Sequence, residues 1–136
     1  MKHIVVVACG AVLATAGCAT AASDDGAISE RAAERLAQFE ATGETENCLS
    51  VMRIQSITAL DERHLLVRVS TNNYYLNKVS GKCNGAQWAG NRLQYTITTG
   101  QLCRNEIITV VDNTTGLTEG SCGLNSFEKL ERIEAR

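Results

Sequence analysis

The chain of 136 residues has no proline, few aromatic residues and no excess of basic residues. Without proline, no apolar segment is excluded as a strand on that ground. The chain has 13 lysines and arginines against 15 aspartates and glutamates, and no basic stripe. Nucleic acids and anionic lipid headgroups are therefore poor partners for it. Beyond the amino terminus, no apolar run approaches the roughly 20 residues of a membrane-spanning helix.

The sequence also lacks the motifs of the common catalytic and cofactor sites. No G-x-G-x-x-G, P-loop or EF-hand spacing is present, and no C-x-x-C pair. His64 is the only histidine beyond the amino-terminal segment, and its position at the start of a strand predicts a solvated turn histidine. We therefore predict no catalytic, cofactor-binding or metal-binding residue. Solvated charges are also expected for the carboxylates near predicted turns, which are Asp61, Glu62, Glu106, Asp112 and Glu119.

The amino terminus has the layout of a secretory signal. The charged start Met1-Lys2-His3 precedes an apolar run over residues 4–13 that is too short to span a membrane. The following Thr15-Ala16-Gly17-Cys18 resembles a bacterial lipobox, in which cleavage before the cysteine allows that cysteine to carry lipid. Two alternatives remain open. One is ordinary cleavage after Ala19-Thr20-Ala21, which would discard the cysteine, and the other is an uncleaved buried strand.

This layout predicts three parts: a signal peptide over residues 1–17, a linker over 18–27, and a single domain over 28–136. Lipid on Cys18 would be the only attachment to a membrane. Ala19, directly after that cysteine, is similar to the sorting pattern of outer-membrane lipoproteins. We therefore expect an exported, periplasmic protein that lipid anchors to the outer membrane.

Residues 29–41 have the pattern of one amphipathic helix, with charges opposite an apolar face. Ser29 suits the N-cap, and Gly43 lies where a helix usually stops. We expect the apolar face to cover one end of the domain rather than to dock a partner. The residues that share this face are Ile28, Ala32, Leu36 and Phe39.

From Cys48 onward, short apolar segments alternate with turn signals. Leu93, Tyr95 and Ile97 alternate with polar residues, as in a half-buried strand. Residues 107–111 are apolar on both faces, which predicts a central strand or a barrel wall. Together these patterns predict a mainly β fold, a small antiparallel barrel or sandwich of about six strands with the amino-terminal helix. The predicted strands span 49–57, 65–70, 74–79, 92–98, 107–111 and 121–127.

Four cysteines lie beyond the amino-terminal segment. Their gaps are too long for a zinc site, and an even number in an exported domain predicts two disulfides with three open pairings. We expect the nested pairing of Cys83 with Cys103 and Cys48 with Cys122. The first bond would clamp a local loop, and the second would tie the first and last strands together.

A set of segments carries a resemblance to a known family: Cys48, Tyr75-Leu76-Asn77, Cys83, Leu102-Cys103, Ile107-Ile108-Thr109-Val110, Ser121-Cys122-Gly123-Leu124 and Phe127. In this spacing the chain resembles a bacterial family of small exported proteins known only as a domain of unknown function. The likeness covers about residues 47–130. It implies an envelope location and disulfides, and it implies no activity because the family has none assigned.

The function that we predict is a non-enzymatic binding or interaction module of the cell envelope, without a cofactor and with an unidentified envelope protein or ligand as its partner. One alternative is a periplasmic inhibitor of a hydrolase, presenting the loop over residues 84–91 to a cleft. Another is a small periplasmic hydrolase that uses His64 or a buried carboxylate pair. Trp88 is the candidate partner contact, although we expect it to fold back over a disulfide.

Overall fold

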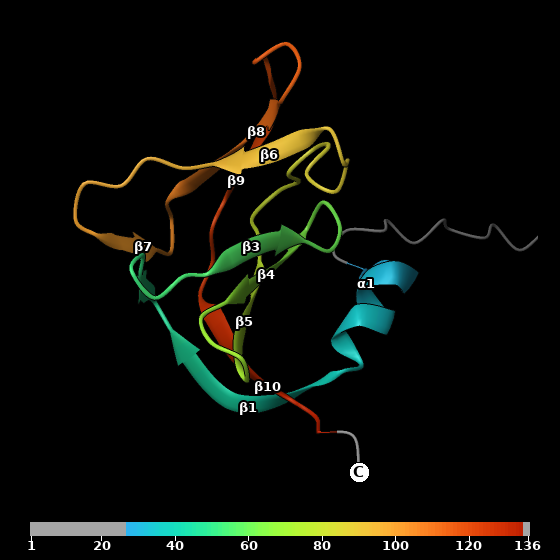
Figure 1. Cartoon of the computed structure of the whole chain (residues 1–136), viewed down its shortest axis with the longest axis vertical. Helices are drawn as coiled ribbons and strands as arrows, with labels where there is room; N and C mark the ends of the chain where they lie inside the picture. Colours follow the sequence, from blue (N-terminus) through green and yellow to red (C-terminus); the bar gives the residue numbers. More distant parts are fainter. Residues whose placement is uncertain (1–26, 135–136) are drawn as a thin grey trace, which may run out of the picture.

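The computed structural model describes residues 27–134, in which one short helix and ten strands form three antiparallel sheets (Figure 1). The elements are α1 (Glu30–Leu36), β1 (Phe39–Glu46), β2 (Cys48–Ser50), β3 (Ser56–Ala59), β4 (His64–Arg68), β5 (Asn73–Lys78), β6 (Asn91–Gln94), β7 (Gln101–Cys103), β8 (Ile107–Asp112), β9 (Thr118–Gly123) and β10 (Phe127–Arg132).

The largest sheet has five strands in the order β1-β10-β5-β4-β3. Its centre is built from the hairpins β3–β4 and β4–β5, whose turns span residues 60–63 and 69–72. The last strand, β10, pairs with β5 on one side and with β1 on the other. The two ends of the described chain therefore meet in one sheet, and β1 and β3 form its edges.

The other two sheets are smaller, with the strand order β6-β8-β9 in one and the pair β2-β7 in the other. β8 is the central strand of its sheet, as the doubly apolar pattern of residues 107–111 predicts. The sheets do not close into a barrel but form a sandwich-like arrangement (Figure 1). The mainly β class with an amino-terminal helix and two disulfides is confirmed, and of the two predicted architectures the sandwich is correct.

The central strands β4 and β5 are buried on both faces, because successive side chains of a strand point to opposite sides. Leu65 and Tyr75 belong to the larger hydrophobic core, which also contains side chains of β8 and β9. Leu66 and Leu76 belong to a smaller core that contains Ala32 of α1. The helix therefore covers one face of the five-stranded sheet, as its apolar face predicts.

α1 begins as predicted and ends earlier than predicted. Ser29 is the N-cap, and its hydroxyl oxygen accepts a hydrogen bond from the backbone N–H of Ala32 at 3.2 Å. The helix ends at Leu36 rather than near residue 41. The next apolar residue of the pattern, Phe39, opens β1 instead and places its ring centroid 4.6 Å from that of Tyr74.

The sequence patterns miss three strands, and several predicted bounds are wrong. β1 is exposed along most of its length and carries no alternating pattern, so pairing with β10 rather than composition makes it a strand. The patterns also miss the short β7 and most of β10. The predicted strand over 49–57 is split into β2 and β3 by a turn at residues 51–53. The predicted strand over 92–98 ends at Gln94, although Leu93, Tyr95 and Ile97 are more buried than their neighbours, as predicted.

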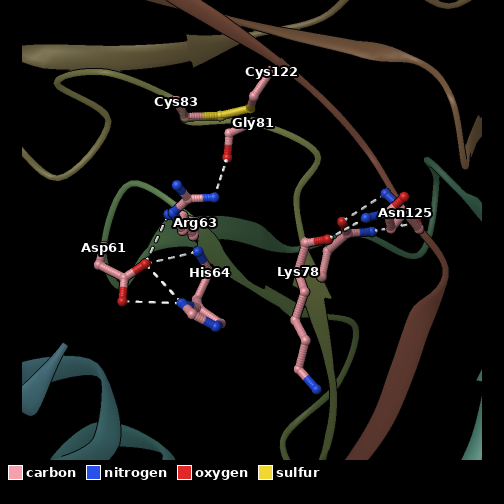
Figure 2. Close-up of a disulfide and its surroundings, with 9 residues drawn as sticks. Asp61, Arg63, His64, Lys78, Gly81, Cys83, Cys122 and Asn125 are labelled. Carbon is pink, nitrogen blue, oxygen red and sulfur yellow. Dashed lines mark hydrogen bonds and ion pairs between the residues drawn. A yellow bond between two sulfur atoms is a disulfide. The ribbon is translucent and has the colours of Figure 1, made fainter. Parts of the chain in front are cut away.

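The disulfides join Cys48 to Cys103 and Cys83 to Cys122, so the nested pairing is wrong. Cys48 and Cys103 are direct partners in the β2–β7 register. Cys83, in the loop after β5, meets Cys122 on β9 (Figure 2). The two bonds span separations of 55 and 39 residues, so neither is a local clamp. The pairing follows from which strands are neighbours, and cysteine spacing does not contain that information.

The predicted signal peptide over 1–17 and lipidation at Cys18 lie outside the described residues, as does the linker over 18–27 except for Ala27. They stay predictions. Within residues 27–134, no helix has the length and apolar character needed to cross a membrane.

Candidate functional site

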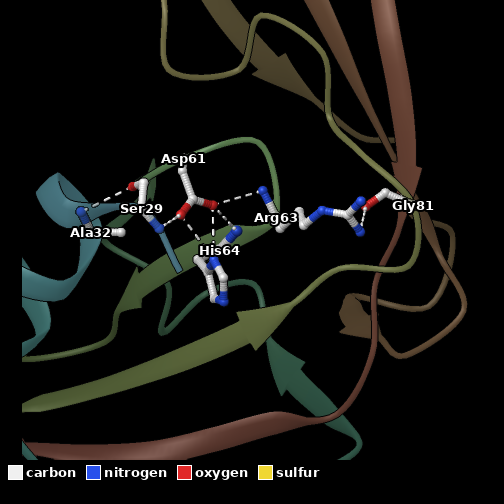
Figure 3. A network of polar contacts seen from close by, with 6 residues as sticks. All are labelled: Ser29, Ala32, Asp61, Arg63, His64 and Gly81. Carbon is white, nitrogen blue, oxygen red and sulfur yellow. Dashed lines mark hydrogen bonds and ion pairs between the residues drawn. The ribbon is translucent and has the colours of Figure 1, made fainter. Parts of the chain in front are cut away.

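A polar network lies at the turn between β3 and β4 (Figure 3). The Asp61 carboxylate accepts hydrogen bonds from the backbone N–H groups of Arg63 and His64, both at 2.8 Å, and of Ser29 at 3.1 Å. The Nδ1 atom of His64 lies 2.8 and 3.0 Å from the two carboxylate oxygens. Only 4% of His64 is exposed, so the prediction of a solvated turn histidine is wrong. The turn folds the imidazole back onto the carboxylate three residues earlier.

The network holds Asp61 as a carboxylate. Burial raises the pKa of this carboxyl, but hydrogen bonds from the backbone of Arg63 and Ser29 and from His64 outweigh burial and lower the pKa from its usual 3.8. An Asp–His pair can orient a general base, a role that requires a nucleophile beside the imidazole. Among the described residues, the side chain of His64 is hydrogen-bonded to Asp61 alone. The network joins the start of α1 to the β3–β4 turn.

The other carboxylates singled out in the sequence are dispersed. Glu106 accepts a hydrogen bond from a backbone N–H across the β7–β8 turn at 2.6 Å. The Asp112 carboxylate accepts two hydrogen bonds, both at 2.7 Å, from the backbone N–H groups of residues 115 and 114. These bonds lower the pKa of Asp112. Glu62 lies in the β3–β4 turn and Glu119 on β9. In the part of the chain that the structure describes, no three His, Cys, Asp or Glu side chains gather in a group that could hold a metal ion.

Trp88 lies on the loop between β5 and β6 and leaves 58% of its surface exposed, rather than being buried over a disulfide. Its ring rests against Gly85, which has a φ of +73°. A Cβ atom at Gly85 would lie 3.1 Å from the indole ring and 2.9 Å from Nδ2 of Asn91. Glycine is thus required both by the backbone conformation and by the close approach of the indole. Because its indole is exposed, Trp88 remains a candidate partner contact.

A groove of about 580 Å³ runs between β3 and β6. It is lined on one side by every residue from 55 to 59, and on the other by residues 91–93 and Tyr95. Since successive strand side chains point to opposite faces, a groove that contacts all of them runs along the edge of the strand. β3 is an edge of the five-stranded sheet, and β6 is an edge of the three-stranded sheet. The groove therefore lies between two sheet edges, with β6 above β3 in Figure 1.

The register of β3 determines which backbone groups face the groove. Leu60 donates its N–H to the carbonyl of His64 at 2.8 Å, so these two residues are a hydrogen-bonded pair. Hydrogen-bonded and non-hydrogen-bonded pairs alternate along an antiparallel ladder. Thr58 is therefore bonded to β4, whereas Ile57 and Ala59 direct their N–H and C=O groups away from β4. Those four backbone groups line the groove without a strand partner.

β6 has the same arrangement. The backbone N–H of Asn113 donates to the carbonyl of Gly90 at 2.9 Å, which makes these two residues a hydrogen-bonded pair. In the β6–β8 register, Arg92 and Gln94 are then bonded to β8. Leu93 directs its backbone groups away from β8, on the side of β6 that has no strand neighbour. Both walls of the groove thus present unpaired peptide groups.

Arginines of α1 extend this site. A second hollow, of about 350 Å³, shares Arg31, Thr58 and Ala59 with the groove and reaches Arg35. We call the two hollows together the β3 groove. Its charged lining residues are Arg31, Arg35, Arg92 and one acid, Glu34. The groove is therefore basic, although the whole chain has a net charge of −2.

The sequence does not indicate the β3 groove. Strand edges are set by the order of strands in a sheet, and no residue of Gln55 to Ala59 has an unusual chemistry. The one available signal is the pair Arg31 and Arg35, spaced by one helical turn on α1.

Comparison with known proteins gives a family and no individual relative. A family model described as "Family of unknown function (DUF6491)" matches residues 1–136. No curated protein and no solved structure matches the chain.

Proposed function

The chain belongs to the DUF6491 family of unknown function, and we propose that it is a non-enzymatic binding module of the cell envelope that holds its partner in the β3 groove. The observation that carries this proposal is that two sheet edges, β3 and β6, line one basic groove. Edge strands with open peptide groups readily pair with another chain, and proteins usually cover or blunt them. An uncovered pair of edges that faces one groove is thus suited to binding.

The two disulfides suggest an oxidising, extracytoplasmic compartment. The amino-terminal sequence supports the further proposal that the chain is exported, cleaved before Cys18 and anchored to the outer membrane by lipid on that cysteine. Labelling of expressing cells with a fatty-acid analogue tests this proposal. The wild-type protein is expected to be labelled and Cys18→Ala is not. An unlabelled wild-type protein whose amino terminus is Ala22 would mean an ordinary secretory signal.

Site-specific photo-crosslinking in the envelope tests the binding function. A photoreactive amino acid is placed at Ser56 in the β3 groove and, as the matched control, at Glu119 on β9. A discrete product is expected from position 56 and not from position 119. The captured protein is then purified and must bind the full chain in solution, with weaker binding to Arg31→Gln. Products from both positions alike, or from neither, would contradict a binding function at this groove.

The exposure of Trp88 supports a second candidate function, the inhibition of a hydrolase by the loop over residues 84–91. An inhibitor needs a rigid exposed anchor that enters a cleft, and the contact with Gly85 holds the indole in place. Under this alternative, Trp88→Ala abolishes partner binding whereas Arg31→Gln leaves it intact. Under the groove proposal, Arg31→Gln weakens partner binding and Trp88→Ala leaves it intact.

A further inference from the structure

We propose that the β3 groove binds an extended acidic segment of a partner protein, which adds to the five-stranded sheet as a new strand beside β3. This inference rests on the proposed binding function and gives the chemistry of its ligand. Strand addition of this kind obtains affinity from main-chain hydrogen bonds and specificity from alternate side chains.

The main-chain part of the argument comes from the β3 register. Ile57 and Ala59 direct two N–H and two C=O groups into the groove, which is the pattern that an added strand requires. The chain contains no proline, and no lysine lies on β3, so two common devices that prevent pairing at an edge are absent from this strand. The peptide groups of Leu93 on β6 lie on the opposite wall.

The two faces of an added strand would meet different chemistry. On one side of β3, Ile57 packs against the larger core together with Leu93 and Tyr95, so this side of the groove is apolar. On the other side, Thr58 is exposed and shares the second hollow with Arg31 and Arg35 of α1. Since side chains alternate along a strand, the ligand should alternate apolar and acidic residues.

Charge favours an acidic ligand over a second copy of this chain as the occupant. A copy would add its own β3, Ser56-Ile57-Thr58-Ala59, which has no acidic residue to meet the arginines. Arg31 and Arg35 have no hydrogen bond or ion pair to another described side chain. Guanidinium groups in this position can each bind a carboxylate, in bidentate geometry where the approach allows it.

The test uses the full chain with both disulfides formed and a fluorescein-labelled octapeptide in which aspartate and valine alternate. Fluorescence anisotropy is expected to give saturable binding below about 1 mM. A peptide with lysine in place of aspartate is expected not to bind. Two further peptides carry N-methyl groups on alternate amides, one set in each register. Strand addition predicts that one methylated peptide loses binding and the other keeps it, because only alternate amides face β3.

Protein variants locate the binding at this groove. Arg31→Gln and Arg35→Gln are each expected to weaken binding by about two- to fivefold, as for exposed ion pairs. Arg104→Gln is the matched control, since Arg104 is exposed and lies outside the groove, and it should leave binding unchanged. Ala59→Pro removes an N–H that points into the groove and none that pairs with β4, so it should abolish binding while the near-UV circular dichroism of the fold is retained.

Several results would overturn the inference. They are equal binding of the lysine peptide, equal loss with both methylated peptides, absence of binding at 1 mM, and a concentration-dependent dimer in sedimentation that Ala59→Pro abolishes. The last result would mean that a second copy fills the groove. If crosslinking from Ser56 still captures a partner in these cases, the binding function stands and only the ligand class is wrong. If that crosslink is absent too, the binding function itself fails.

Discussion

The side-chain amide of Asn77 is hydrogen-bonded to both backbone groups of Asn125, donating to its carbonyl at 2.6 Å and accepting from its N–H at 3.0 Å. Asn77 is fully buried on β5, and Asn125 lies in the connection by which the chain passes from β9 to β10. The amide of Asn125 in turn donates to the carbonyl of Lys78 at 2.7 Å (Figure 2). The buried amide of Asn77 thereby fastens the connection between β9 and β10 to β5.

Replacing this amide should destabilise the fold. Asn77→Ala leaves the two backbone groups of Asn125 without their partner, which should lower the free energy of unfolding by about 1–3 kcal/mol. Urea denaturation followed by circular dichroism measures the change. Asn72→Ala is the control, because Asn72 is exposed in the β4–β5 turn and its side chain makes no hydrogen bond to a described residue. A loss at Asn77 no larger than at Asn72 would contradict the role of the pair.

The two disulfides should contribute equally to stability. Their separations of 55 and 39 residues give about 4 kcal/mol each in the chain-entropy model. We expect the double variants Cys48→Ala/Cys103→Ala and Cys83→Ala/Cys122→Ala to lose similar stability in thermal unfolding. Non-reducing peptide mapping checks the pairing itself: a fragment that links Cys83 to Cys103 would contradict the structure.

Asp61 should make the fold sensitive to acid. Its folded pKa is lowered below the 3.8 of an unperturbed aspartate, so the unfolded chain takes up the proton first as pH falls. The stability that the Asp61 carboxylate contributes is fully present above the pKa of 3.8 in the unfolded chain. It is lost as the pH falls from 3.8 through the lower pKa of the folded protein. Asp61→Asn should cost roughly 1–3 kcal/mol at pH 7 and flatten the stability profile below pH 4. Urea midpoints from pH 7 to pH 2 measure both effects. An unchanged profile would mean that other carboxylates dominate the acid response.

Alanine substitutions at Gly85 and Gly81 distinguish the cost of backbone strain from the cost of crowding against a side chain. Both have positive φ values, +73° and +75°, but an added Cβ meets no atom within 4 Å at Gly81. Gly81→Ala should therefore cost only the left-handed conformation, about 1–2 kcal/mol. Gly85→Ala adds the clash with Trp88 and should cost more, with a shift in the emission of this single tryptophan. Equal costs and unchanged emission for both variants would exclude crowding at the indole.

The sequence predicts the fold class but not the arrangement of strands. Local signals succeed where they act locally: Ser29 at the N-cap, and the apolar pattern of β8 at the centre of its sheet. They fail for β1, because its strand conformation depends on β10, about 85 residues later in the chain. The disulfide pairing fails for the same reason, since Cys48 meets Cys103 only after β2 and β7 have paired.

The candidate site is even harder to predict from the sequence than the arrangement of strands. The charged residues around His64 in the sequence predict a solvated histidine. Only the fold of the turn buries its side chain against Asp61. The β3 groove consists of peptide groups whose availability depends on the absence of a neighbouring strand. Peptide groups are the same in every residue, so no side-chain pattern can identify the groove.

The position of β10 between β1 and β5 has a consequence for the order in which the chain can fold. Synthesis supplies β1 before β10, so β1 must wait until residues 47–126 have been made before its partner exists. Until residues 127–132 emerge, the sheet contains only β3, β4 and β5, and the core beneath α1 lacks Leu130. A chain cut short before β10 therefore cannot assemble the five-stranded sheet, and β1 is left without the strand that connects it to β5.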